Sequence, residues 1–109
     1  MSFKIFFAPK AKKQISKLDE VTKHAIKDYL ETKMSISENI KELYKIGGTE
    51  LVGNLKGLWR FKDTSFKKYR IIAYIDDRAL CITILSVESR NDSYKNKENL
   101  AKKARNGIF

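Results

Sequence analysis

The sequence predicts an α+β domain: an opening strand, a helical hairpin packed on an antiparallel sheet of three to four strands, and a short C-terminal helix. Two patterns indicate this class. Apolar residues recur at helical spacing through most of the first half of the chain. From Leu55 the period changes to two, which is typical of half-buried strands. A length of 109 residues suits one hydrophobic core, so we expect a single domain over residues 1–109.

The first elements expected are a strand and two helices. Phe3–Phe7 combines aromatic and β-branched residues, which favour a strand, and Pro9 then favours the start of a helix. Asp19 can cap a second helix that runs to about residue 34. The apolar stripe of this second helix is expected to consist of Val21, Ala25, Ile26, Tyr29, Leu30 and Met34.

A further helical segment is expected before the sheet. Ser35 to Glu38 has the spacing of a capping box, and Ile36, Ile40 and Leu43 continue the helical period. The glycine pair at 47 and 48 then ends the segment. It is either a third short helix or a bent continuation of the second.

The first strand of the main sheet is predicted at Leu55–Lys62. Trp59 and Phe61 fall on one face of this strand, while Arg60 and Lys62 fall on the other. Trp59 therefore has two interpretations, a core residue or a platform for stacking on a base, and its alternation with Phe61 favours the core. Residues 63–68 are mostly polar and are expected to form a loop.

Two further strands are predicted at Tyr69–Ile75 and Leu80–Val87, because both segments are rich in β-branched residues. The four residues between them suit a tight antiparallel turn. In the tail, residues 95–109, apolar side chains recur every four residues among lysines and arginines, so we expect a marginal basic helix there.

The charge of the chain indicates a polyanionic partner. There are 23 basic and 13 acidic side chains, a net charge of +10, and residues 55–109 hold 13 of the basic and 6 of the acidic ones. Such an excess favours nucleic acid, an acidic protein or an anionic membrane surface. The sequence shows neither an apolar run of membrane-spanning length nor a signal-peptide pattern, so we expect a cytoplasmic protein without a membrane partner.

The candidate site is the basic and aromatic stretch Leu58–Arg70. Residues of one parity on antiparallel strands share a face, so Arg60, Lys62 and Arg70 should meet there, with Arg90 just past the last strand. Repulsion makes such a cluster unfavourable unless an anion such as a phosphate chain binds it. Taken singly, each of these cations is better explained as an ordinary exposed charge on the solvent face of the sheet.

Five more residues complete the set of candidates. Tyr94 lies in a polar stretch where burial does not require an aromatic side chain, so it is expected to stack on a base or donate a proton. The additional candidates for contacts with RNA are Lys56, Lys67, Lys68 and Lys95.

The sequence also excludes several kinds of site. His24 is the only histidine and belongs to the expected helical hairpin, which excludes a Ser-His-Asp triad, a paired-histidine ribonuclease site and a His/Cys zinc site. There is no GxxxxGK[ST] or GxGxxG element for a nucleotide. We therefore expect neither a metal nor a cofactor.

The motifs L-K-G-L-W-R-F-K, Y-R-I-I-A-Y-I and L-S-V-E-S-R-N-D-S-Y follow a strand and a helical hairpin, and in this order they resemble the RelE/ParE toxin superfamily over essentially the whole chain. The resemblance implies a RelE-like fold and a toxin of a type II toxin–antitoxin system. On the RelE side it implies a ribosome-dependent, metal-independent endoribonuclease that cleaves mRNA in the A site and inhibits translation. In that reaction the 2′-hydroxyl attacks the adjacent phosphate and releases a 5′-hydroxyl.

The resemblance also implies roles for the candidate residues. Arg60 and Lys62 match the two basic positions of the superfamily's second strand, Arg70 the arginine of its Tyr-Arg pair, Arg90 the basic residue after the last strand, and Tyr94 the C-terminal aromatic. Arg70 and Arg90 are expected to clamp phosphate, since a guanidinium grips two oxygens. Lys62 is the candidate general base, because neighbouring cations favour a neutral amine. Tyr94 or Arg60 would serve the leaving 5′ oxygen.

Two alternatives to the ribonuclease remain open. One is a ParE-like toxin that poisons DNA gyrase without cleaving RNA, and the other is a nucleic-acid-binding domain without catalysis or toxicity. Both toxin interpretations imply a cognate acidic antitoxin that forms a hetero-oligomer with the chain, in addition to ribosome and mRNA as targets of the ribonuclease. The segment Lys97–Phe109 is where we expect the antitoxin to compete, since a short helix is displaced easily.

Overall fold

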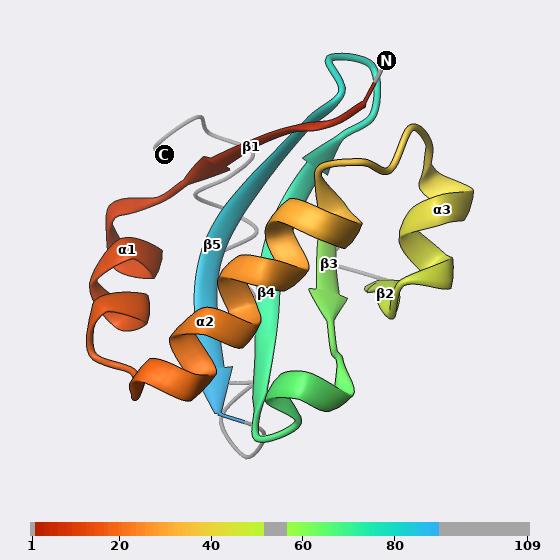
Figure 1. The fold of residues 1–109 in the computed structure, drawn as a ribbon. Coiled ribbons are helices and arrows are strands. Elements are labelled where there is room, and N and C mark those ends of the chain that lie inside the picture. The colour runs from red at the N-terminus through yellow and green to blue at the C-terminus, as the bar shows by residue number, and fades with distance from the viewer. Residues whose placement is uncertain (1, 52–56, 90–109) are drawn as a thin grey trace.

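The computed structural model describes residues 2–51 and 57–89, which form a helical layer on one face of a five-stranded sheet (Figure 1). The strand order is β1-β5-β4-β3-β2, with β1 parallel to β5 and all other neighbouring strands antiparallel. The strands are β1 (Lys4–Phe7), β2 (Gly48–Glu50), β3 (Leu58–Phe61), β4 (Tyr69–Asp76) and β5 (Cys81–Ser89). The predicted α+β class is confirmed, and β2 is a short edge strand that the sequence did not indicate.

The helical hairpin is also confirmed. Helix α1 (Pro9–Ser16) begins at its proline, and α2 (Glu20–Tyr29) is capped by Asp19, whose carboxylate accepts a hydrogen bond from the Thr22 amide at 3.1 Å. Figure 1 shows α2 lying across the sheet. In the described part of the chain, no helix has both the length and the apolar composition needed to cross a membrane.

The third helical segment is separate from α2. After Tyr29 the chain makes a π-helical turn (Leu30–Met34), in which the Ser35 amide donates to the Leu30 carbonyl at 2.9 Å. Helix α3 (Ile40–Lys45) begins only at Asn39, whose side chain accepts from the Glu42 amide at 3.0 Å. The predicted capping box at Ser35 is therefore wrong, because the nearer amide acceptor is Asn39.

Two residues predicted for apolar faces are exposed. Ile36 is 64% exposed because it lies in the link between the π-helical turn and α3. Val21 is 78% exposed. It lies five residues before the buried Ile26, which is about 140° around a helix, so it faces away from the sheet.

The main core lies between the helices and the sheet. Trp59 and Phe61 of β3 are fully buried there, which confirms the predicted parity. Phe66 is buried as well, at 3% exposure, because residues 63–68 contain a 3-10 turn (Thr64–Phe66) that sets its ring 5.1 Å from that of Tyr29. The prediction of a simple polar loop was wrong at this point.

The other face of the sheet is not uniformly polar. Leu58, Ile72 and Leu85 are buried in a second cluster, together with Ala8. Leu58 shares its face with Arg60, since side chains two apart on a strand point the same way. The basic residues therefore lie next to an apolar patch on the face opposite the helices.

Candidate functional site

Three predicted site residues lie on one face of the sheet, near the end of β3 and the start of β4. Arg60 of β3 pairs with Ile72 of β4, and Phe61 pairs with Ile71. Continuing this antiparallel register by one residue sets Lys62 opposite Arg70, the second residue of β4. Arg60 and Arg70 are half-buried and Lys62 is exposed.

A groove of about 380 Å³ opens at this end of the sheet, and we call it the basic groove. Its charged lining consists of four cations and one carboxylate, so its field favours anions. Lys67, predicted as an RNA contact, lies in this lining, whereas Lys68 is exposed but not part of it. The lining residues are Lys45, Ile46, Gly47, Lys62, Asp63, Thr64, Lys67 and Arg70.

The structure adds one cation and leaves four candidates untested. Lys45, the last residue of α3, joins the basic groove because the glycine pair turns the chain back beside β3. Its only sequence signal was its place before those glycines. Four predicted site residues lie outside the described part of the chain: Lys56, Arg90, Tyr94 and Lys95.

Lys62 is held through its backbone by Gly47. The Lys62 amide donates to the Gly47 carbonyl at 3.2 Å, and Gly47 has a φ of +105°, which L side chains rarely adopt. A Cβ on Gly47 would overlap the carbonyl oxygen of Lys62. The path of the chain at Lys62 therefore depends on a glycine at position 47.

We expect Gly47→Ala to lower the free energy of unfolding by about 2 kcal/mol or more, because the substitution adds strain at a positive φ and a clash with backbone. Urea unfolding followed by circular dichroism measures this loss. A Gly47→Ala protein as stable as the parent would contradict the packing at Lys62.

Arg70 is oriented by the turn that precedes it. Its Nη1 donates to the carbonyl oxygens of Lys67 at 3.0 Å and Tyr69 at 2.9 Å. These two bonds hold one edge of the planar guanidinium against the backbone. Its direction therefore depends on the 3-10 turn and on the residue that caps it, Asp63.

Asp63 joins the basic groove to the helical layer. One carboxylate oxygen accepts from Ser65, from the amide at 3.1 Å and from the hydroxyl at 2.6 Å. The other oxygen forms an ion pair with the Lys33 ammonium at 3.0 Å. Lys33 also lies 5.7 Å from the centre of the Tyr29 ring, and the Tyr29 hydroxyl donates to the carbonyl of Ile46, a groove residue, at 2.7 Å.

These contacts set the protonation of Asp63. Burial raises the pKa of its carboxyl, but the hydrogen bonds from Ser65 and Lys33 and the Lys33 charge outweigh burial, so the pKa lies below its ordinary value. Burial, and then the Asp63 charge, raise the pKa of the Tyr29 hydroxyl. Because both its oxygens are engaged and its pKa is lowered, Asp63 is suited to hold the turn and not to accept a proton.

We expect Asp63→Asn to lower stability at neutral pH by no more than about 1 kcal/mol, because the Lys33 side chain is 47% exposed and asparagine can still cap the turn. A lowered folded-state pKa contributes stability above the unfolded value, near 4, and this is lost as pH falls through the folded value. The difference between Asp63→Asn and the parent should therefore shrink below about pH 4. Urea unfolding at pH 7 and pH 3 measures it, and an equal difference at both would contradict the ion pair.

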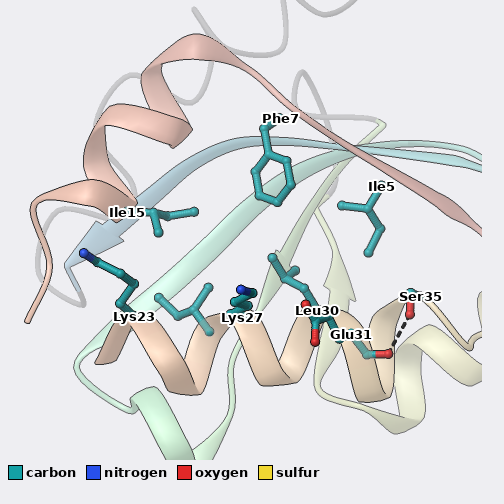
Figure 2. Close-up of a pocket in the computed structure, with 9 residues that line it drawn as sticks. Ile5, Phe7, Ile15, Lys23, Lys27, Leu30, Glu31 and Ser35 are labelled. Atoms are coloured by element: carbon teal, nitrogen blue, oxygen red, sulfur yellow. Dashed lines mark hydrogen bonds between the residues drawn. The ribbon is translucent and has the colours of Figure 1, made fainter. Parts of the chain in front are cut away.

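A second, apolar groove lies apart from these residues, between β1, α1 and α2 (Figure 2). It measures about 450 Å³, and Ile5, Phe7, Ile15, Ile26 and Leu30 supply its apolar lining. The charged side chains that border it are Lys23, Lys27 and Glu31, whose carbonyl accepts from the Ser35 hydroxyl at 2.6 Å. Mostly aliphatic walls do not suit chemistry on a phosphate. The basic groove is therefore the candidate site, although it is the smaller of the two.

Metal ligands do not gather in the part of the chain that the structure describes: no three histidine, cysteine, aspartate or glutamate side chains there are placed to hold an ion.

Comparison with known proteins now gives the family. A sequence model described as the ParE toxin of the type II toxin–antitoxin system parDE matches residues 5–94, which is most of the chain. The chain belongs to the ParE toxin family. This membership confirms the resemblance to the RelE/ParE toxin superfamily. No curated protein matches this ParE-family chain significantly.

Solved structures share the fold of this ParE-family chain. The RelBE2 toxin–antitoxin complex from Mycobacterium tuberculosis matches at 22% identity with a TM-score of 0.67, over 83% of this chain and 100% of that one. A mutant of the Escherichia coli toxin RelE in the free state matches at 18% identity with a TM-score of 0.67, over 95% of this chain and 98% of that one. The YoeB–YefM complex from Staphylococcus aureus matches at 20% identity with a TM-score of 0.56, over 83% of this chain and 99% of that one. At these identities the matches establish the RelE-like fold.

Proposed function

We propose that this toxin is a ribosome-dependent, metal-independent endoribonuclease that cleaves mRNA in the A site and so inhibits translation. The observation that supports it is the basic groove, which gathers Lys45, Lys62, Lys67 and Arg70 around a single carboxylate. That carboxylate, Asp63, is paired with Lys33. The net field of the groove is therefore positive, as a bound phosphate chain requires.

The proposed reaction needs a clamp and two proton transfers. The 2′-hydroxyl of one nucleotide attacks the adjacent phosphorus, the bond to the 5′ oxygen breaks, and a cyclic phosphate and a 5′-hydroxyl result. Arg70, with Arg90, binds the phosphate oxygens, on which charge builds up in the transition state. Lys62 lies beside Arg70 for proton transfer, and Arg60 or Tyr94 assists the leaving oxygen.

The remaining basic residues are proposed to bind the RNA chain outside the reacting phosphate. Lys67 lies in the basic groove, and Lys68 is exposed next to it in the chain. Lys56 and Lys95 are included on their sequence positions alone. Each such phosphate contact should add to the salt dependence of binding and little to sequence preference.

An acidic antitoxin is the proposed partner in the cell, where this toxin would act in the cytoplasm. The support is the family itself and the toxin–antitoxin complexes that share the fold, among them RelBE2 and YoeB–YefM. A net charge of +10 favours an acidic protein that binds the basic surface and forms a hetero-oligomer.

The test is to induce the chain in a bacterial host, with and without its neighbouring gene, and to map the 5′ ends of cellular mRNA. Cuts inside translated codons that disappear when translation is blocked would support the proposal. RNA binding that weakens steeply with salt, without cuts and without toxicity, would indicate a nucleic-acid-binding domain instead.

A second candidate function is poisoning of DNA gyrase without cleavage of RNA. The observation that favours it is the family model, which is that of ParE toxins. The filled set of basic residues in the groove favours the ribonuclease. Induction of the DNA-damage response while mRNA stays intact would decide for gyrase.

A further inference from the structure

Glu88, a carboxylate on β5, lies across from the basic residues of the site. β4 and β5 pair so that Arg70 lies directly opposite Glu88. Lys62, directly after β3, comes opposite Arg70 on the other side when the β3–β4 register is continued by one residue. Lys62, Arg70 and Glu88 therefore form a row that runs from the end of β3 across β4 to β5. Neighbouring strands are about 4.8 Å apart, so Arg70 is the centre of the row and the other two lie on either side of it.

A β-bulge places Glu88 on this face. The β4–β5 register shifts between Ile72 and Ala73, and Leu85 is the extra residue on β5. Before the bulge Ile84 packs into the main core, and after it Val87 does. Residues 84 and 87 share a face only because one residue is inserted between them, and this insertion turns Glu88 away from the main core.

Glu88 forms an ion pair with one cation and lies across from another on the neighbouring strand. Its carboxylate lies 3.8 Å from the ammonium of Lys10 at the start of α1, and its side chain is 12% exposed. Arg70 is its cross-strand neighbour on β4. The oxygens of a carboxylate at this position can accept a proton.

We propose that Glu88 is the general base of this site, in place of Lys62; this rests on the proposed ribonuclease function. The Glu88 carboxylate takes the proton of the 2′-hydroxyl while the 2′ oxygen bonds to phosphorus. As the bond from phosphorus to the 5′ oxygen breaks, the Lys62 ammonium gives that oxygen a proton. Glu88 ends protonated and Lys62 neutral, and exchange with solvent restores both.

The order of the row suits this chemistry. In an in-line displacement the attacking and leaving oxygens lie on opposite sides of phosphorus. A phosphate bound at Arg70 has Glu88 on one side and Lys62 on the other, so base and acid are separated as the two oxygens are. A carboxylate is also already ionised at neutral pH, whereas a lysine must first lose a proton to act as a base.

The test measures single-turnover cleavage of mRNA on programmed ribosomes by the full chain and by E88Q, an isosteric variant that cannot accept the proton. We expect E88Q to be slower by about 100-fold or more. The control, E20Q, removes an exposed carboxylate on α2 and should stay within about two-fold of the parent. Thermal melting verifies that each variant is folded.

A second measurement needs no variant. If Glu88 is the base, the cleavage rate of the unchanged chain stays level from about pH 6.5 to 8, whereas a lysine base would make it rise nearly ten-fold per unit. A cleavage rate that rises steeply with pH, or an E88Q protein that cleaves within about three-fold of the parent rate, would overturn the role of Glu88 but not the ribonuclease function. Failure of the unchanged chain to cleave would overturn the ribonuclease function and the inference with it.

Discussion

Replacing Arg70 with alanine should abolish toxicity and slow mRNA cleavage by about 100- to 1,000-fold, the usual loss when one group that stabilises transition-state charge is removed. The reason is its position: Arg70 lies in the basic groove at the centre of the row across β3, β4 and β5, with its guanidinium fixed by two backbone carbonyls. Growth after induction and single-turnover cleavage on ribosomes measure the two effects.

Arg78→Ala is the matched control for that experiment. It removes the same side chain from the exposed turn between β4 and β5, at the other end of β4, so both activities should be unchanged. Arg70→Lys should recover only part of the rate, because an ammonium keeps the charge but cannot grip two oxygens. An Arg70→Ala protein that is folded and as toxic as the parent would refute the assignment of the site.

Arg90→Ala tests the same clamp from the sequence alone, since Arg90 lies outside the described residues. If both arginines bind the reacting phosphate, each single variant should be strongly impaired. The double variant should then lose less than the product of the two single losses, because residues that act as a unit are not additive. Independent, fully multiplicative losses would contradict a shared clamp.

Trp59→Ala should have the largest effect on stability, a loss of about 3–5 kcal/mol. The Trp59 ring is fully buried, 4.8 Å from the centre of the Tyr44 ring and 6.1 Å from that of Phe61. Most small domains have only about 5–15 kcal/mol in total, so this variant should be close to unfolding at 37 °C. Urea unfolding followed by circular dichroism measures it, because the variant has no tryptophan left to report by fluorescence.

Two controls separate burial from a role in binding. Val21→Ala removes apolar atoms from a residue that is 78% exposed and should change stability by less than about 0.5 kcal/mol. Trp59→Phe keeps most of the packing and should bind RNA as tightly as the parent, since the indole does not face the basic groove. Loss of RNA affinity in a stable Trp59→Phe protein would instead indicate a stacking platform.

Much of this fold could be predicted because its signals are local. Pro9 and Asp19 begin helices through their own backbone and side-chain chemistry, and both were found where expected. Alternation along β3 separated Trp59 and Phe61 from Arg60 before any partner strand was known. The errors arose where local patterns compete. Ser35 and Asn39 both suit a helix start, and only packing of the π-helical turn decides between them.

The sequence by itself therefore determined the class of the fold, the buried half of β3 and three of the cations that meet at its end. Only the tertiary structure decided what surrounds them. Lys45 reaches the basic groove because β2 pairs with β3, and Glu88 turns toward Arg70 because a bulge inserts Leu85 into β5. The alternation of side chains along a strand can be read from its own sequence. A β-bulge, in contrast, depends on how the strand pairs with its neighbour. By parity alone Glu88 would have been placed with Ile84 in the main core.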